Sequence, residues 1–206
     1  MKKLYLTPTL LNSWQYYLNA NFSLEENAKT SFINCLNKIK TEPTPDMIRG
    51  LNFENDVYEF LEGKLEFIEP TAFEVSQIVK GSMFQVPLMK KFLNFENYEI
   101  YIYGIADCVN KNIIYDIKSV KNYDIGKYKS SAQHKIYLSA SNADTFKYVV
   151  SDGDCVFEEE YNKSPKLEEE LKELILDFLY WLQVNDIFNV FVGLWGADEK
   201  LEAMED

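Results

Sequence analysis

Residues 98–118 read YEIYIYGIADCVNKNIIYDIK, and this stretch decides the fold. Its two halves, 98–107 and 113–118, are rich in β-branched and aromatic residues, which is typical of strands. The turn-forming Asn110-Lys111-Asn112 separates them. Strands joined by so short a connection must be antiparallel neighbours, so the sequence predicts a hairpin here.

The hairpin brings charged residues together. Side chains alternate between the faces of a strand, so Asp116 and Lys118 project together while Ile117 points into the core. Asp107 ends the preceding strand, and two carboxylates and one ammonium therefore converge. Clustered carboxylates raise each other's pKa unless positive charge neutralises them. Lys118 supplies one charge, and a hard divalent cation such as Mg²⁺ suits the rest.

A divalent cation at such a site would polarise a phosphodiester oxygen, lower the pKa of bound water and stabilise the leaving oxygen. Lys118 would then orient or help to deprotonate the attacking water, or stabilise the pentavalent phosphorus. The sequence leaves these three roles open. The alternative is an ordinary surface Asp–Lys pair on a strand, which is common for any lone D-x-K.

Working outward from the hairpin, Thr/Ser-Pro pairs predict helix starts, with the hydroxyl residue as N-cap and proline at the first helical position. A capping-box pattern, Ser23-Leu24-Glu25-Glu26, predicts one more. We expect helices over about 7–19, 23–39, 44–61, 130–139 and 164–184. Further strands are expected over 82–88, 145–150 and 155–161. The segment 70–80 is ambiguous and fits a short helix.

These elements predict an α/β sandwich: a central mixed sheet flanked by helices, with extra N-terminal helices and a long C-terminal helix. The sequence contains no repeat, low-complexity tract or linker, so we expect a single domain over 1–206. Its core is expected over about 44–161, and the acidic tail 193–206 is expected to fray.

The composition, 47% hydrophobic and 15% aromatic, fits a packed globular protein. No apolar run approaches the roughly 20 residues that cross a bilayer, and the N-terminus lacks the pattern of a signal peptide. We therefore expect a cytoplasmic protein without a membrane partner. Cys35, Cys108 and Cys155 form no CxxC pair, and we expect three small buried or half-buried side chains.

The net charge of −12 argues at first against a nucleic-acid partner. However, residues 151–206 hold 16 acids against 4 lysines, whereas residues 1–150 hold 17 acids and 17 bases. The excess acid therefore lies in the C-terminal part of the sequence. Affinity for DNA is expected to be modest and weakened by salt.

The order of the motifs resembles the PD-(D/E)XK nuclease superfamily, specifically its RecB-like and phage (lambda) exonuclease-like branch. In that branch a G-x-x-D strand precedes a D-x-K strand, as at Gly104–Asp107 and Asp116–Lys118. A helix with Q-x-x-x-Y follows, here Gln133–Tyr137, and a helix with R-G-x-x-x-E comes before, here Arg49–Glu54. The opening Leu6–Trp14 is similar to the N-terminal helix of the family.

The resemblance spans about residues 4–150 and implies a restriction-endonuclease-like sandwich that binds Mg²⁺ or Mn²⁺. Ala106 stands where the superfamily's name has proline, a change usual in this branch. The cysteines that hold an iron–sulfur cluster in some RecB-like members are missing, so no cluster is implied. The implied catalytic residues are Glu54, Asp107, Asp116, Lys118, Gln133 and Tyr137. The implied metal-site residues are Glu54, Asp107, Asp116 and Ile117.

Several of these residues have ordinary alternatives. Glu54 would face the metal directly or through water, but it also fits a solvated helix acid. Gln133 would hold a metal-bound water or contact the DNA backbone, or else cap the edge of a helix packed by Tyr137. His134, the only histidine, points about 100° away from Gln133 on the helix, so we do not expect it to be catalytic.

Basic residues near the motifs are candidates for DNA contacts. Arg49, the only arginine, has a fork that suits phosphate, and a structural ion pair with a local acid is the competing interpretation. Four lysines are candidates for contacts with the DNA backbone, or plain solvated charges: Lys121, Lys127, Lys129 and Lys135.

The resemblance implies a metal-dependent DNA nuclease, foremost an exonuclease or end-processing enzyme of recombination or repair that could be phage-encoded. A single-strand annealing protein or a helicase would be its partner, and a homo-oligomer is possible. Two alternatives stay open. One is a structure-specific endonuclease, and the other is a catalytically inert nuclease fold that binds DNA or protein.

Overall fold

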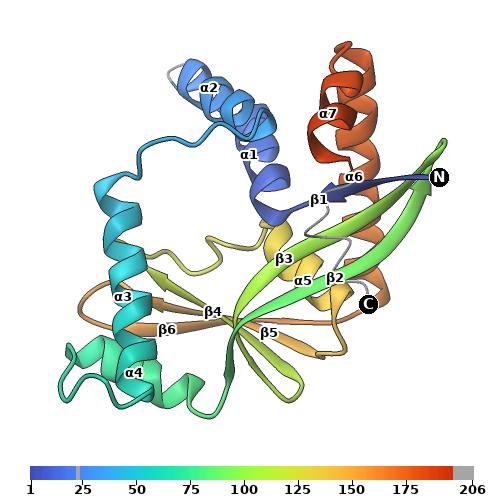
Figure 1. Ribbon diagram of the computed structural model, residues 1–206. Helices are drawn as coiled ribbons and strands as arrows, with labels where there is room; N and C mark the ends of the chain where they lie inside the picture. Colours follow the sequence, from blue (N-terminus) through green and yellow to red (C-terminus); the bar gives the residue numbers. More distant parts are fainter. Residues whose placement is uncertain (22–23, 197–206) are drawn as a thin grey trace.

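The computed structural model of the chain describes residues 1–21 and 24–196, and it forms a mixed sheet between two groups of helices (Figure 1). The strands are β1 Lys2–Leu6, β2 Met83–Phe95, β3 Tyr98–Asn110, β4 Ile113–Ser119, β5 Thr145–Ser151 and β6 Val156–Asn162. The helices are α1 Pro8–Asn19, α2 Glu25–Leu36, α3 Pro45–Leu61, α4 Pro70–Val79, α5 Ala132–Ala140, α6 Pro165–Val184 and α7 Phe188–Trp195.

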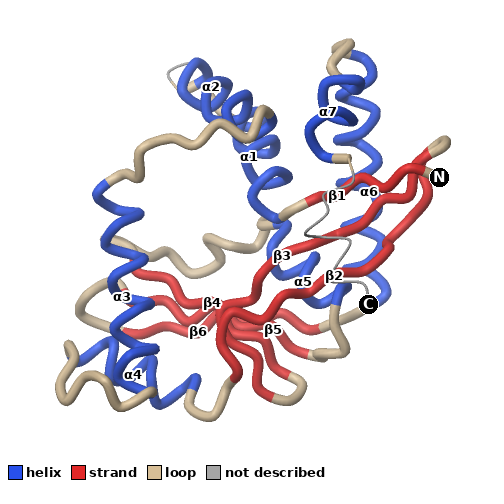
Figure 2. Tube along the Cα trace, viewed as in Figure 1, coloured by secondary structure: helices blue, strands red, loops and turns tan. Residues whose placement is uncertain are grey.

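The sheet has the order β1-β3-β4-β5-β6, and β2 pairs with β3. The β1–β3 and β4–β5 pairs are parallel, and the other pairs are antiparallel. The predicted hairpin is confirmed, because β3 and β4 pair antiparallel through the 110–113 turn. Figure 2 shows the long β2–β3 ribbon bending away from the other strands toward β1.

Each face of the sheet carries its own apolar cluster. On one face α3 and α4 pack against β3, β4 and β5, through residues such as Val57, Val75, Ile117 and Val149. The other face carries the larger cluster, to which α1, α2, α5, α6 and α7 contribute. Ile117 thus points into the core as the alternation predicted. The predicted sandwich of helices around a mixed sheet is confirmed.

Side-chain caps start four helices, and three of them are the predicted Thr/Ser-Pro sites. Thr7 accepts a hydrogen bond from Leu10 N at 3.3 Å, Thr44 from Met47 N at 3.2 Å, and Ser164 from Leu167 N at 3.2 Å. Such bonds satisfy backbone donors that a helix start leaves free. Ser131 caps α5 in the same way. Ser23, the first residue of the predicted capping box, lies outside the described residues.

β2 runs on to Phe95, beyond the expected 82–88, and two elements were not foreseen from the sequence. The first, β1, was not expected: its Leu4 and Leu6 lie in register with Ile100 and Ile102 of β3 and are fully buried. The second, α7, falls where a fraying tail was expected to begin. β1, α1, α6 and α7 all supply buried apolar residues from outside the stretch 44–161. The rest of the predicted tail, 197–206, lies outside the described residues.

Within the described part of the chain, no single helix is long and apolar enough to span a membrane. Only α6 and α7 taken together meet that test, and they are bent by 119° at their junction. The cysteines are free; Cys108 is buried and Cys35 half-buried, whereas Cys155 is exposed, contrary to the expectation for it.

His134 lies in the core on α5. Its ring stacks on Tyr161 with 3.9 Å between ring centroids, and its Nδ1 has no hydrogen-bond partner among the described residues. Burial, with a smaller contribution from the charge of Lys135, lowers the pKa of His134 from 6.5 to about 4. A buried imidazole resists protonation, which is the behaviour of a packing residue.

The stability of the protein should therefore depend on pH through His134. Between pH 6.5 and about 4 the unfolded chain binds a proton that the folded chain refuses, so the free energy of unfolding falls as the pH decreases. The slope from this group is at most about 1.4 kcal/mol per pH unit. His134→Phe keeps an aromatic ring and should weaken the pH dependence of thermal melts between pH 7 and pH 5. The same dependence in both proteins would contradict the inference.

Candidate active site

Strands β3 and β4 separate at Asp107, and this gap is called the opening of the sheet below. On one side β3 pairs with β2 at Ala106 and Cys108, and on the other side its pairing with β4 begins only at Cys108, so Asp107 has no ladder partner on either side. Its carboxylate instead accepts a hydrogen bond from the backbone N–H of Ile117 at 2.9 Å. The Asp107 side chain thus fills the place where β3 and β4 separate, and it lies beside the D-x-K strand.

Asp116 is fully buried at the same opening. Its carboxyl group lies within hydrogen-bonding reach of Asp107, and the Lys118 ammonium lies 2.5 Å from its Oδ2. Gln133 of α5 donates to the other oxygen, Oδ1. The two carboxyl groups therefore lie side by side at the opening, and each has polar partners that hold its orientation.

The third acid comes from α3. Glu54 Oε1 accepts a hydrogen bond from the Tyr58 hydroxyl at 2.6 Å and another from Gln85 Nε2 at 2.8 Å. The same hydroxyl lies 3.2 Å from the carbonyl oxygen of Asp107. Glu54 is thus tied to the opening of the sheet rather than being a freely solvated helix acid.

A close packing contact joins two of the motifs. The Tyr137 hydroxyl donates to the carbonyl oxygen of Ile105 at 2.8 Å. A Cβ added at Gly104 would lie 2.3 Å from the Tyr137 ring, a distance that no side chain tolerates. Glycine at this position therefore lets α5 approach β3, and that approach places Gln133 over Asp116.

The N-terminal motif contributes to the same arrangement. Asn12 Oδ1 accepts a hydrogen bond from Ala132 N at 2.7 Å, and its Nδ2 donates to Ser131 Oγ at 3.1 Å. These bonds fix α1 to the start of α5, one residue before Gln133. A cavity of about 430 Å³ lies between these elements, lined by Thr7, Pro8, Thr9, Asn12, Tyr103, Gly104, Ile105, Lys118, Gln133 and Tyr137.

The pKa values of the three acids at the opening are raised. Burial first, then the charge of Asp116, raises the pKa of Asp107 well above its ordinary value. Burial is also the main cause that raises the pKa of Glu54 and of Asp116, although Lys118 counteracts it at Asp116. For Lys118 burial lowers the pKa, but the charges of Asp116 and Asp107 outweigh it and the pKa is raised. Lys118 is therefore held in its charged form.

The predicted metal-site residues lie near one another at the opening, but their side chains are not already arranged around a metal ion. Asp107, Asp116 and the backbone of Ile117 are in contact, and Glu54 lies near enough for its charge to act on both acids. Across residues 1–21 and 24–196, no three Asp, Glu, Cys or His side chains are already arranged to hold a metal ion.

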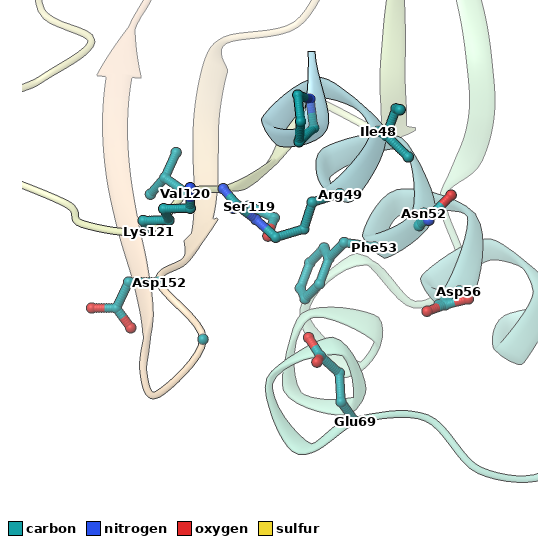
Figure 3. A pocket seen from close by; sticks show the side chains of 12 residues that line it. Ile48, Arg49, Asn52, Phe53, Asp56, Glu69, Ser119, Val120, Lys121 and Asp152 are labelled. Carbon is teal, nitrogen blue, oxygen red and sulfur yellow. The ribbon is translucent and has the colours of Figure 1, made fainter. Parts of the chain in front are cut away.

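A second cavity, of about 530 Å³, is lined by residues of α3 and reaches the end of β4 (Figure 3). Arg49 extends from α3 into it, toward Ser119 and Lys121. Arg49 and Lys121 each lie 2.9 Å from Asp46. The ion pair that competed with a phosphate contact for Arg49 is thus present, and both basic groups line a hollow beside the site.

The other candidate DNA contacts are placed differently. Lys127 is exposed and lies over the Tyr128 ring, 5.9 Å from its centroid, and Lys129 is exposed two residues further on. Lys135 is 13% exposed and lies 2.8 Å from Glu170 of α6. Lys135 is therefore mostly buried and is paired with a partly exposed acid, so a DNA contact for it stays a prediction.

The structure adds two residues that the sequence did not single out, Tyr58 and Gln85. Tyr58 lies four residues after Glu54, and this spacing places both on one helix face. No spacing rule links Gln85 to Glu54, since the contact depends on how β2 lies beside α3.

No protein-family model and no curated protein matches this sequence. Solved structures do match. SSO0001 is 17% identical with a TM-score of 0.53, over 86% of this chain and 76% of that one. LHK-Exo, the alkaline exonuclease of Laribacter hongkongensis, in complex with dAMP, is 12% identical with a TM-score of 0.51, over 87% and 88%. A Eubacterium rectale protein assigned as an exonuclease is 10% identical with a TM-score of 0.51, over 92% and 82%.

The chain shares the fold of these solved structures, which is consistent with the PD-(D/E)XK-like fold that the motifs implied. In this fold the opening between β3 and β4 carries the D-x-K strand, and α5 covers it with the Q-x-x-x-Y helix. The fold and the order of the motifs therefore agree with each other.

Crowding of buried acids predicts that neutralising one of them stabilises the metal-free protein. Asp107→Asn keeps an oxygen to accept the Ile117 N–H and removes one of two neighbouring negative charges. We expect a gain on the order of 1 kcal/mol at pH 8, or about 2–4 °C in Tm for a chain of this size. Thermal melts in excess EDTA measure it.

Asp56→Asn is the matched control, because Asp56 is an exposed residue of the same helix as Glu54. It should leave the Tm nearly unchanged. A lower Tm for Asp107→Asn would show that the two carboxyl groups stabilise the metal-free fold, contrary to this account.

Proposed function

We propose that this protein is a divalent-metal-dependent nuclease that hydrolyses phosphodiester bonds of DNA. The observation that carries the proposal is the meeting of Asp107, Asp116 and Lys118 at one opening of the sheet, with Glu54 beside them. The nuclease fold and the named exonucleases among its neighbours support it.

The donor set fits a hard divalent cation. Asp107 and Asp116 offer oxygen atoms, which Mg²⁺ and Mn²⁺ prefer, and two buried negative charges with only one ammonium beside them favour further positive charge. Glu54 would hold the cation directly or through water, and Ile117 contributes backbone only. When bound, the cation would supply Lewis-acid stabilisation of negative charge on the phosphate.

The protein's own residues would bind and orient the reacting groups. Lys118 lines the 430 Å³ cavity and carries a positive charge, so it can hold a phosphate oxygen or stabilise the charge that develops on phosphorus. Gln133 fixes Asp116, and Tyr137 fixes β3 through Ile105. Hydrolysis adds water across the P–O bond, and the leaving oxygen takes up a proton.

Of the two nuclease activities, the exonuclease is the better supported. Two of the structural neighbours, each with a TM-score of 0.51, are named as exonucleases. An end-processing role in recombination or repair, a phage origin, a cytoplasmic location, a partner such as an annealing protein or a helicase, and a homo-oligomeric state are further parts of the proposal. Mg²⁺ is the first choice of cation and Mn²⁺ the second.

Cleavage should depend on the metal and on the residues of the opening. We expect linear DNA to be degraded with Mg²⁺ or Mn²⁺ and to stay intact in EDTA. Asp116→Asn or Lys118→Ala should lower the rate by at least about a hundred-fold, the scale for loss of a positioned catalytic group. Gel assays of end-labelled DNA measure the rate, and circular dichroism checks the fold of each variant.

Lys147→Ala is the control for this experiment. Lys147 forms ion pairs with Glu158 and Glu160 between β5 and β6, on the same sheet but outside the opening. It should keep near-normal cleavage. Unimpaired cleavage by both site variants would refute the assignment, and binding of DNA without any cleavage in either metal would favour the inert module.

A circular substrate separates the two nuclease activities. An exonuclease needs an end, so a covalently closed circle should survive while the same DNA, linearised, is degraded under the same conditions. Both forms are incubated with the protein and Mg²⁺ and followed on one gel. Linearisation or fragmentation of the circle would show an endonuclease instead.

A further inference from the structure

One residue of β2 has an unusual backbone. Gln85 has φ +51°, in the left-handed region that residues other than glycine rarely adopt. Among the described residues the other positive-φ positions that are not glycine all lie in turns between elements: Lys38, Glu96, Lys111 and Asp186. Gln85 is the one that lies inside a strand.

This distortion lies opposite Asp107. The β2–β3 register pairs Phe84 with Cys108 and Val86 with Ala106, so Gln85 would face Asp107, but these two residues form no pair. The break in β2 therefore lies across β3 from the place where β3 and β4 separate, and both irregularities meet at Asp107. Backbone strain of this kind tends to persist at functional sites.

The Gln85 side chain contacts two residues of α3, Glu54 and Tyr58. Its Nε2 lies 2.8 Å from Glu54 Oε1 and 3.2 Å from the Tyr58 hydroxyl, which itself donates to Oε1 at 2.6 Å. Phe84 packs against the Tyr58 ring, with 4.6 Å between ring centroids, and so fixes that hydroxyl. A glycine would suit the backbone better at position 85, yet only a longer polar side chain makes these contacts.

Both bonds end on the same oxygen. Within the described residues no hydrogen bond is made to Glu54 Oε2, so one oxygen is anchored and the other is left for a further ligand. Carboxylates that hold metal ions are commonly held in this way by outer hydrogen bonds, and loss of such a bond typically weakens metal affinity by about 10–100-fold.

We propose that Gln85 and Tyr58 are positioning residues, which hold the Glu54 carboxylate in place for the divalent cation. Neither touches the cation; both act through Glu54. The proposal rests on the proposed metal site and names two residues needed to complete it.

Metal affinity tests this without any measurement of cleavage. Mn²⁺ is titrated into the metal-free full-length protein by isothermal titration calorimetry at constant pH. Gln85→Gly and Tyr58→Phe should each weaken Mn²⁺ binding by about tenfold. Gln85→Gly should keep or raise the Tm of the metal-free protein, because glycine adopts the positive φ without strain. Retained stability with lost affinity separates positioning from a structural role.

A double-mutant cycle tests whether the effect passes through Glu54. In a Glu54→Gln background, Gln85→Gly should not weaken Mn²⁺ binding further, since the carboxylate that it positions is gone. A further tenfold loss in that background would overturn the proposal. Unchanged or tighter binding by both single variants would overturn it too, and tighter binding would mean that the two bonds hold Glu54 away from the ion.

Two controls make the outcomes distinguishable. Gln183→Ala removes a matched bond, Gln183 Nε2 to Glu96 Oε1 at 2.8 Å, far along the chain from the site, and should leave Mn²⁺ affinity unchanged. Asp116→Asn reports on the metal site itself. If the unaltered protein fails to bind Mn²⁺, the proposed function fails. If it binds and Asp116→Asn does not, while Gln85→Gly and Tyr58→Phe bind normally, only the positioning proposal fails.

Discussion

Two carboxyl groups, Asp107 and Asp116, lie within hydrogen-bonding reach of each other inside the sheet, and much of the surrounding structure is arranged around this unfavourable pair. Burying one negative charge beside another costs free energy, because neither the solvent nor a counter-ion screens the repulsion fully. Lys118 and the amide of Gln133 offset part of that cost at Asp116. The backbone N–H of Ile117 does so at Asp107. A fold that keeps this arrangement is suited to a cation.

The acids meet only because the sheet is broken there. In a regular antiparallel hairpin Asp107 would pair with a neighbouring strand, and its backbone groups would be satisfied by the ladder. Here its carbonyl oxygen faces the Tyr58 hydroxyl, and its carboxylate takes the N–H of Ile117. The opening thus leaves Asp107 with polar partners, whereas the buried Oδ2 of Asp116 has, among the described residues, no hydrogen-bond partner beyond its ion pair with Lys118. It also lets Glu54, which comes from the helix layer on one face, approach Asp116, whose partner Gln133 belongs to the helix on the other face.

The sequence predicted those parts of the fold that depend on local rules. Hydroxyl caps followed by proline placed three helix starts. Strand-forming residues around a short turn predicted the hairpin, and alternation predicted the inward direction of Ile117. It missed β1, because a strand of five residues that begins Lys2-Lys3 is defined by its pairing with β3 rather than by its composition. It missed Gln85 for a similar reason: a left-handed glutamine and its contact with Glu54 follow from the tertiary arrangement alone.

The distribution of ion pairs bears on how an acidic chain would hold a polyanion. On the β6 and α6 side, acids are paired with lysines that would otherwise attract DNA: Lys90 with Glu168, Lys135 with Glu170, and Lys147 with Glu158 and Glu160. Beside the opening, Arg49 and Lys121 share Asp46, so their positive charge is also partly neutralised. These ion pairs weaken the attraction of those basic groups for a phosphate backbone, whereas the exposed Lys127 and Lys129 are in none of these pairs. A cation at the carboxylates would change this balance at the one place where cleavage would occur, so occupancy by metal and capture of the scissile phosphate should be coupled, and DNA without metal should be held weakly.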